Sequence, residues 1–192
     1  LTQPSSLSIN LDGSVNAICF DSCNGVINIT VSGGDSTYLY YWSGPNGFTS
    51  NNDDLTNLCY GEYIITIDDG ISTITDTFNI FQPQPITSIL SVDSINCFDG
   101  STQAAINVWG GTQPFTYNWS NGDNTYSTTL SAGNHSIIVN DINGCGISES
   151  FLLTNPDSII STATSTDINC FGNNTGTASI NINNGGTSPF IF

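Results

Sequence analysis

The chain consists of one pattern that occurs three times. A tripeptide that begins with Cys-Phe recurs along the sequence, and each copy is followed by alternating apolar residues and then by a Gly-Gly pair. The tripeptides are Cys19-Phe20-Asp21, Cys97-Phe98-Asp99 and Cys170-Phe171-Gly172. The second glycines of the pairs, Gly34, Gly111 and Gly186, are 77 and 75 residues apart. This period is too long for a solenoid repeat of about 20 to 50 residues, so each copy is expected to be one small domain.

Prolines stand at the borders between the copies. Pro83 and Pro85 follow the first copy, and Pro156 follows the second. Proline cannot donate a backbone hydrogen bond to a sheet, and it stiffens a connecting segment. We therefore expect three domains, at residues 1–82, 83–155 and 156–192. The third domain is truncated at Phe192, in the middle of the pattern, so the chain is expected to be an internal fragment of a longer, exported protein.

Each copy shows the period of two that is typical of β-strands. Ile27, Ile29 and Val31 alternate with polar residues in the first copy. Their counterparts are Ala104, Ile106 and Val108 in the second copy and Ala178, Ile180 and Ile182 in the third. Such alternation predicts a strand with one buried face. An aromatic strand is expected next, at 38–42 and 115–119, and later strands near 58–67, 75–81, 130–139 and 148–153.

The number and spacing of these strands predict the fold class. No stretch shows a convincing helical period, and several short strands separated by turns fall within about 75 residues. Trp42 and Trp119 lie on the third expected strand of their copies, where an immunoglobulin domain carries its core tryptophan. We therefore expect an all-β protein of tandem immunoglobulin-like β-sandwich repeats, arranged as a rod. Each domain is small and would be marginally stable alone.

The charge of the chain excludes several kinds of partner. The sequence has no Lys or Arg, 16 acidic residues and a formal net charge of −16, while 38% of its residues are hydrophobic. Because the chain has no cationic Lys or Arg side chain to bind phosphate groups, we expect no nucleic-acid partner and no electrostatic docking on anionic lipid. No apolar run is long enough to span a membrane, so direct membrane insertion is not expected.

The six cysteines predict disulfides and an oxidising compartment outside the cytoplasm. Zinc is the competing interpretation, but His135 is the only histidine, and the cysteine spacing fits no zinc module. His135 occupies a position where the first copy has a tyrosine, which favours a tyrosine-corner role over that of a catalytic base. No nucleophile motif such as Gly-x-Ser-x-Gly is present, and we expect no enzymatic activity.

Four residues at strand ends are candidate calcium ligands. Asp68, Asp69, Asp141 and Asn143 could supply the oxygen atoms that calcium prefers. The alternative is turn chemistry, since Asp and Asn side chains bind neighbouring backbone amides at such places. No EF-hand-like spacing is present, which favours the turn. We therefore expect no cofactor, with calcium as the open alternative.

The shared motifs resemble the SprB-repeat family, whose repeats build giant surface adhesins of gliding bacteria. The second copy carries the family pattern nearly throughout: Cys97, Gly110-Gly111, Pro114-Phe115-Thr116-Tyr117, Trp119-Ser120, Gly122, Leu130, Gly133, Asp141, Gly144-Cys145 and Pro156. It departs from the pattern at His135, and the first copy has Asp69-Gly70-Ile71 in place of the terminal Gly-Cys. The resemblance implies an extracellular filament at the cell surface, exported by the type IX route and active in adhesion or gliding motility, without catalysis.

Two disulfide schemes are open. The plain scheme pairs Cys97 with Cys145 inside the second copy, but in immunoglobulin topology these residues lie at opposite ends of a sandwich. About seven residues at ~3.3 Å each separate the two ends, whereas a disulfide needs Cα atoms within about 7 Å. In a head-to-tail rod, Cys19 would instead face Cys145 of the next repeat, Cys23 would pair with Cys59, and Cys97 and Cys170 would pair with residues beyond this fragment.

Two functions follow from these features. The first is a structural segment of a filament, which spaces and transmits force and whose partners are further repeats of the same chain. The second is a module that binds surface polysaccharide or other cells, with the outward-facing Trp109 as its candidate ligand contact. Ser32 and Asn183 occupy the equivalent positions, so the aromatic contact is not repeated. A glycan array probed with two repeats would discriminate between these functions.

Overall fold

The computed structural model describes residues 5–35, 37–172, 174–186 and 188–191. Among these residues it contains β-strands and one 3-10 turn at Pro45–Gly47, and no α-helix. The chain divides into two compact units. The first comprises Leu1–Thr87, Val108–Phe115 and Asn140–Ile147, and the second comprises Ser88–Asn107, Thr116–Val139 and Ser148–Phe192. No helix in the described ranges is long and apolar enough to span a membrane.

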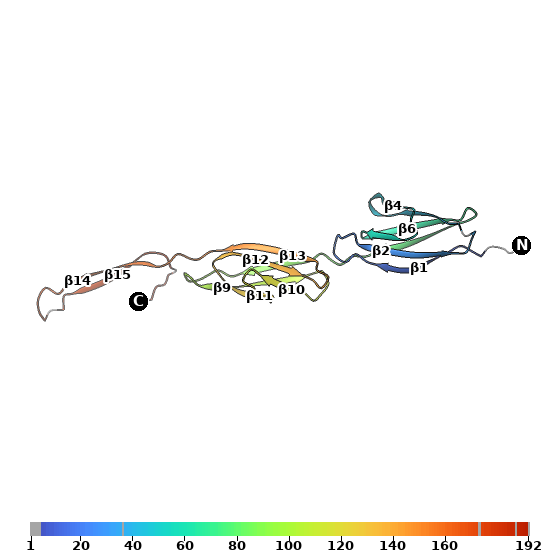
Figure 1. Cartoon of the computed structure of the whole chain (residues 1–192). Helices are drawn as coiled ribbons and strands as arrows, with labels where there is room; N and C mark the ends of the chain where they lie inside the picture. The colour runs from blue at the N-terminus through green and yellow to red at the C-terminus, as the bar shows by residue number, and fades with distance from the viewer. Residues whose placement is uncertain (1–4, 36, 173, 187, 192) are drawn as a thin grey trace. The chain divides into compact units, whose positions relative to one another are not determined.

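Seven strands of the first unit form a two-sheet sandwich (Figure 1). One sheet has the order β1-β2-β5 and the other has the order β4-β3-β6-β7. The bounds are β1 (Ser8–Val15), β2 (Gly25–Ser32), β3 (Leu39–Ser43), β4 (Thr49–Ser50), β5 (Leu55–Leu58), β6 (Gly61–Asp68) and β7 (Thr73–Ile80). The division of neighbouring strands between two sheets is the immunoglobulin arrangement.

The register of each sheet places the alternating apolar residues on the inner face. β2 pairs antiparallel with β1, and Ile29 lies opposite Leu11. β6 pairs antiparallel with β3, and Trp42 lies opposite Ile65. Because side chains alternate between the two faces of a strand, these registers direct Ile27, Ile29 and Ile65 into one core.

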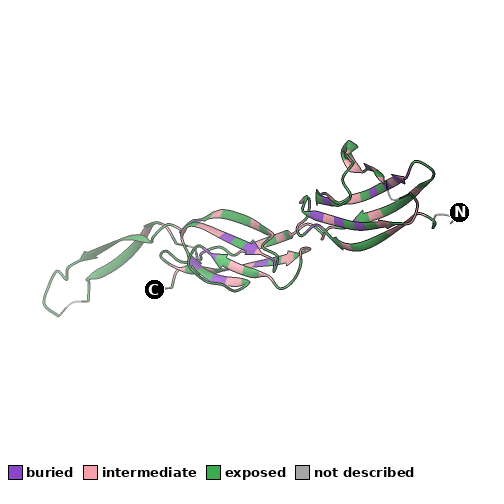
Figure 2. Ribbon diagram, turned by 45° about the vertical axis from the view of Figure 1, so that its right-hand side comes forward, coloured by how far each residue is buried: buried purple, intermediate pink, exposed green. Residues whose placement is uncertain are grey.

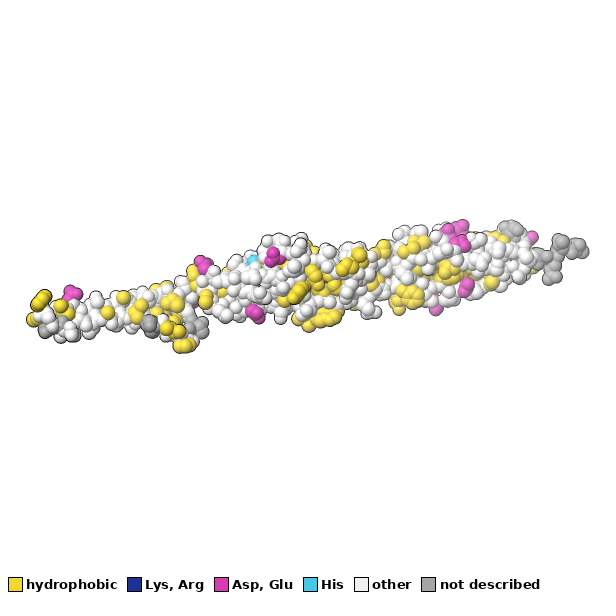
Figure 3. Space-filling view, turned by 90° about the horizontal axis from the view of Figure 1, so that it is seen from below, with side chains coloured by type: hydrophobic (Ala, Val, Ile, Leu, Met, Phe, Trp, Pro, Cys, Tyr) yellow, Lys and Arg dark blue, Asp and Glu magenta, His cyan; other side chains and the backbone are white. Residues whose placement is uncertain are grey.

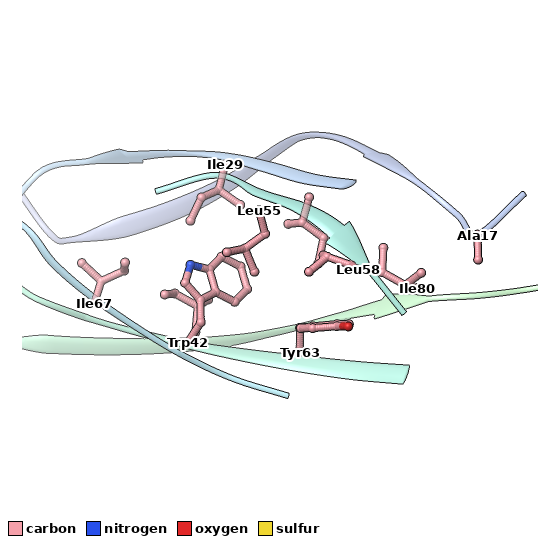
Figure 4. Packing of buried hydrophobic residues seen from close by; sticks show 10 residues of the cluster. Ala17, Ile29, Trp42, Leu55, Leu58, Tyr63, Ile67 and Ile80 are labelled. Carbon is pink, nitrogen blue, oxygen red and sulfur yellow. The ribbon is translucent and has the colours of Figure 1, made fainter. Parts of the chain in front are cut away.

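The core of the first sandwich surrounds Trp42. Its side chain rises from β3 toward Leu55 and Ile29 of the opposite sheet (Figure 4), and only 2% of it is exposed. The indole Nε1–H donates a hydrogen bond to the Asn52 carbonyl oxygen at 2.9 Å, so the polar atom of the ring is satisfied inside the core. Tyr63 is equally buried, and its hydroxyl donates to the Cys59 carbonyl oxygen at 3.0 Å.

Six strands form a second sandwich. They are β8 (Thr87–Val92), β9 (Ser101–Trp109), β10 (Thr116–Trp119), β11 (Ser127–Ser131), β12 (Gly133–Asn140) and β13 (Gly146–Leu153). The sheets have the orders β11-β9-β8 and β10-β12-β13. Trp119 on β10 is 1% exposed and donates to the Thr125 carbonyl oxygen at 2.8 Å. Ile106, Ile137 and Val139 of the same sandwich are also buried, so this sandwich, like the first, has a buried tryptophan among buried aliphatic side chains.

In the third copy, β14 (Ile160–Thr166) and β15 (Thr177–Asn184) form an antiparallel hairpin. In Figure 2 the hairpin is almost entirely green, whereas the strands of both sandwiches carry stripes of buried residues. Ile180, the counterpart of the buried Ile106, is 47% exposed. The alternation that predicts a buried face is therefore present in the third copy, but no second sheet covers it in the part of the chain that the structure describes.

The structure confirms the all-β, immunoglobulin-like prediction. The expected aromatic strands at 38–42 and 115–119 correspond to β3 and β10, and the expected strand at 148–153 is the later part of β13. The domain borders at 82 and 155 and the rod arrangement stay predictions.

The acidic side chains are dispersed over the surface. Figure 3 shows them as separate spots on the face that it draws, without a continuous acidic patch.

Candidate functional site

The candidate site is the pair of turns that a disulfide joins, one from each of the first two repeats. Cys19 bonds to Cys145, with the Cα atoms 5.6 Å apart and the two residues 126 positions apart in sequence. This separation lies within the range that unstrained disulfide geometry allows. The structure thus contains the inter-repeat pair expected from the sequence, and Cys145 is not bonded to Cys97. We call these two turns the clasp.

The Cys19 turn is built from local hydrogen bonds. The Ser22 amide and hydroxyl both donate to the Cys19 carbonyl oxygen, at 3.2 and 2.8 Å. Asp21 has a φ of 58°, a left-handed conformation that aspartate tolerates better than most residues. Its amide donates to Oε1 of Gln82 at 2.8 Å, which ties the turn to the end of the repeat. The sequence did not predict this role of Gln82, since a single side-chain amide in a loop carries no pattern.

The Cys145 turn is organised by Asp141. This carboxylate is 3% exposed, and one oxygen accepts hydrogen bonds from the amides of Asn143 and Cys145, both at 2.9 Å. The other oxygen accepts from the Thr112 amide at 2.9 Å, directly after the Gly-Gly pair. Asp141 therefore fixes the Cys145 backbone and connects it to a second loop. The sequence analysis did not predict this hydrogen bond to the Gly-Gly loop. The aspartate that precedes the turn in both complete copies, Asp69 and Asp141, could have indicated it.

Asp69 has the same role in the first repeat. Its carboxylate accepts hydrogen bonds from the amides of Ser72 and Ile71 at 2.6 and 2.9 Å, and from the Asp35 amide at 3.2 Å. These hydrogen bonds, chiefly that from Ser72, hold the pKa of Asp69 below its usual value because they favour the charged carboxylate. The first repeat has this turn without a cysteine.

The candidate calcium ligands are thus engaged in turn chemistry. Asp68 accepts a hydrogen bond from the Gly70 amide at 2.8 Å. The carboxylates of Asp69 and Asp141 also accept hydrogen bonds from backbone amides of their turns. Within the described part of the chain, no three His, Cys, Asp or Glu side chains cluster in a way that could hold a metal ion. Asn143 contributes its backbone amide to the Asp141 turn.

The remaining cysteines divide into a second bond and two free thiols. Cys23 bonds to Cys59, the intra-repeat pair expected from the sequence. Cys97 and Cys170 are free and exposed. Their pairing with residues outside this chain, expected from the sequence, stays a prediction.

Two further residues singled out in the sequence have clear environments. His135 replaces the buried Tyr63 at the tyrosine corner, and its Nε2 lies 2.8 Å from the Ser131 carbonyl oxygen. The Tyr63 hydroxyl likewise lies 3.0 Å from the Cys59 carbonyl oxygen. The interaction repeats at the same spacing of four residues, so a structural role accounts for His135. Trp109 is 52% exposed at the end of β9, which leaves its ring accessible, and its role as a ligand contact stays a prediction.

A family model described as the SprB repeat matches this chain three times, at residues 12–47, 89–124 and 162–192. A comparison with curated protein sequences gives no match. Among solved structures, the N-terminal four Ig domains of Dscam1 isoforms 7.44 and 9.44 are similar in fold, each with a TM-score of 0.36 and 10% identity. The match covers 80% of this chain and 46% of each Dscam1 chain, so this chain spans less than half of their length.

Proposed function

This chain belongs to the SprB-repeat family, and from that premise we propose that it is a structural segment of an extracellular adhesin filament. In this role the repeats space a binding region away from the cell surface and transmit force in adhesion or gliding motility. The role requires no catalysis and no cofactor. Export by the type IX route and a cell-surface location are parts of the same proposal, and disulfides that persist outside the cytoplasm support them.

The observation that carries the proposal is the bond between Cys19 and Cys145. It joins the first repeat to the second covalently, in addition to the polypeptide itself. A disulfide that closes a long loop removes much conformational freedom from the unfolded chain. A segment that must keep its length under load gains from such a bond, whereas a module that only binds a ligand has no evident use for it.

The bond also changes the path that a pulling force takes. Force applied at the two termini passes from Cys19 to Cys145 through the sulfur atoms and bypasses the 126-residue interval between them. The strands β2 to β12 lie inside that interval, so their unfolding adds no length to the chain while the bond is intact, whereas β1 and β13 lie outside it and remain under load. The Cys23–Cys59 bond lies within the same interval, so it carries no load under these conditions.

Single-molecule pulling from the two termini tests this property. The oxidised chain should release a shorter contour length on full unfolding than the Cys145→Ser variant. The Cys23–Cys59 bond remains in this variant and still bypasses 36 of the 126 residues. The expected difference is therefore about 315 Å, because each of the other 90 residues contributes up to about 3.5 Å when extended.

The Cys23→Ser, Cys59→Ser double variant is the matched control. Its bond lies inside the bypassed interval, so its released length should equal that of the oxidised parent. Equal released lengths for the parent and the Cys145→Ser variant would show that the clasp carries no load and would refute this mechanical role.

A further inference from the structure

A groove of about 350 Å³ lies beside the clasp, within the first unit. Its volume is at the lower end of the range for small-molecule pockets, about 300 to 1,000 Å³. Its lining includes Asn16, Ile18, Phe81, Gln82, Thr112 and Asn143. None of the described residues that line it is charged, although the chain has 16 acidic residues. The groove is therefore a neutral site on an acidic molecule.

Two side-chain amides of the groove are oriented by backbone donors. Oδ1 of Asn16 accepts a hydrogen bond from the Phe81 amide at 2.9 Å, and Oε1 of Gln82 accepts one from the Asp21 amide at 2.8 Å. A backbone N–H can only donate, so each side chain turns its oxygen to that donor and keeps its NH₂ group for an acceptor. Within the described part of the chain, neither NH₂ group has an acceptor. The groove thus carries neutral donors that are held in place and are not used internally.

Phe81 adds an apolar surface to these donors. Its ring lines the groove and is 61% exposed. Its backbone is fixed on both sides, because its amide donates to Asn16 and its carbonyl oxygen accepts from the Ala17 amide at 2.9 Å. An exposed aromatic ring on a fixed backbone can pack against the C–H face of a ligand. The groove therefore combines an apolar platform with oriented polar groups, as small-ligand sites do.

The corresponding groove of the second repeat has neither the ring nor the amide. Asp93 and Thr154 lie in its lining. Asp93 follows the Ser-Val pair of its repeat, where the first repeat has Asn16. Thr154 follows the last buried residue of its sandwich, where the first repeat has Phe81. Both sandwiches fold with different residues at these positions, so the fold alone does not account for Asn16 and Phe81.

Charge and shape select the class of ligand. The net charge of −16 and the absence of Lys and Arg oppose an anionic ligand. The lining offers no carboxylate to pair with a cation. A neutral sugar has hydroxyl oxygens that accept hydrogen bonds from the amides and a flat C–H face that packs on an aromatic ring. An uncharged peptide has carbonyl acceptors but no such face, so the sugar fits the groove better.

We propose that this groove binds a neutral sugar unit of a polysaccharide. The ring of the sugar packs on Phe81, and the side-chain amides of Asn16 and Gln82 donate to its hydroxyl oxygens. The proposal goes beyond the structural role, because it gives the first repeat a ligand of its own. It does not involve Trp109, and it does not depend on how the chain responds to force.

Titration of the oxidised, isotope-labelled chain with neutral tetrasaccharides tests the proposal by NMR. The probes are cellotetraose, mannotetraose, galactotetraose and chitotetraose, each at up to about 10 mM, which detects affinities in the millimolar range. At least one probe should shift the side-chain amide signals of Asn16 and Gln82. N-acetyl tetra-alanine amide, an uncharged peptide, should shift neither signal.

Two variants take their residues from the second repeat. Phe81→Thr removes the ring at an exposed position and should weaken binding about tenfold. Asn16→Asp keeps an oxygen for the Phe81 amide but removes the NH₂ donor, and it should weaken binding to a similar extent. Tyr60→Thr is the control, because Tyr60 is an exposed aromatic residue of the same repeat outside the groove. Its affinity should equal that of the parent, and the backbone amide spectrum reports that each variant is folded.

Several results would overturn the proposal. These are the absence of shifts with all four sugars, parental affinity in Phe81→Thr or Asn16→Asp, and a loss of affinity in Tyr60→Thr equal to that in Phe81→Thr. Equal shifts with the peptide and the sugars would also overturn it, since the groove would then recognise amide groups. None of these results would affect the pulling experiment on Cys19 and Cys145.

Discussion

A buried carboxylate holds the same turn in both complete repeats. Asp69 and Asp141 are 6% and 3% exposed, and each accepts hydrogen bonds from amides of its own turn and from one amide next to the Gly-Gly pair. Buried carboxylates are stable when backbone amides satisfy them. In the second repeat the turn ends in the cysteine of the clasp, so Asp141 positions the sulfur through the backbone.

Replacement of Asp69 by asparagine should reduce the pH dependence of stability. The folded pKa of Asp69 is lowered, chiefly by the Ser72 amide, whereas an unfolded aspartate has a pKa of about 3.9. The stabilisation is therefore complete above about pH 4 and is lost as the pH falls through the folded value. Thermal unfolding from pH 2 to 7 should show a lower midpoint for Asp69→Asn at pH 7 and a smaller loss on acidification.

Asp21→Asn is the control for this measurement. Asp21 is an exposed residue of the same repeat, and asparagine tolerates its positive φ equally well. An acid profile of Asp69→Asn that matches those of the parent and of Asp21→Asn would show that the Asp69 hydrogen bonds do not contribute to stability.

At the scale of elements, the strands were predictable and the contacts between loops were not. Alternation within residues 27–31 and 104–108 predicts which side chains face the core, because side chains on a strand alternate with a period of two. The pairing of Asp35 with Asp69, or of Asp21 with Gln82, depends on which loops meet after folding. Single polar residues in turns carry no period, so these contacts become visible only in the structure.

The Gly-Gly turn provides a prediction at this scale. Gly34 has a φ of 63°, and a Cβ at this position would collide with the Asp69 carboxylate. Gly34→Ala should therefore destabilise the first sandwich by about 2 kcal/mol or more, the left-handed backbone alone costing about 1–2 kcal/mol for a residue with a Cβ. Chemical denaturation monitored by tryptophan fluorescence measures the change.

Gly13→Ala is the matched control, because a Cβ there would meet no atom within 4 Å. Its stability should differ from that of the parent by less than about 0.5 kcal/mol. If both variants had the same stability as the parent, the close contact between the Gly-Gly turn and Asp69 would be absent in solution.

At the scale of the whole chain, the two disulfides form nested covalent loops. Cys23–Cys59 closes an interval of 36 residues within the 126-residue interval of Cys19–Cys145. The outer bond crosses from one repeat to the next, which distinguishes this chain from a series of independently closed immunoglobulin domains. Cys19 of the first Cys-Phe tripeptide is therefore one half of a link whose other half, Cys145, lies in the second repeat.

The inter-repeat bond is tested most directly by mapping disulfides in the non-reduced protein. Trypsin has no Lys or Arg to cut, but cleavage before aspartate at Asp21 separates Cys19 from Cys23. We predict one linked peptide pair that contains Cys19 and Cys145, and a second pair that contains Cys23 and Cys59. A pair that joins Cys97 to Cys145 would contradict the account, because each repeat would then be closed on itself and not linked to its neighbour.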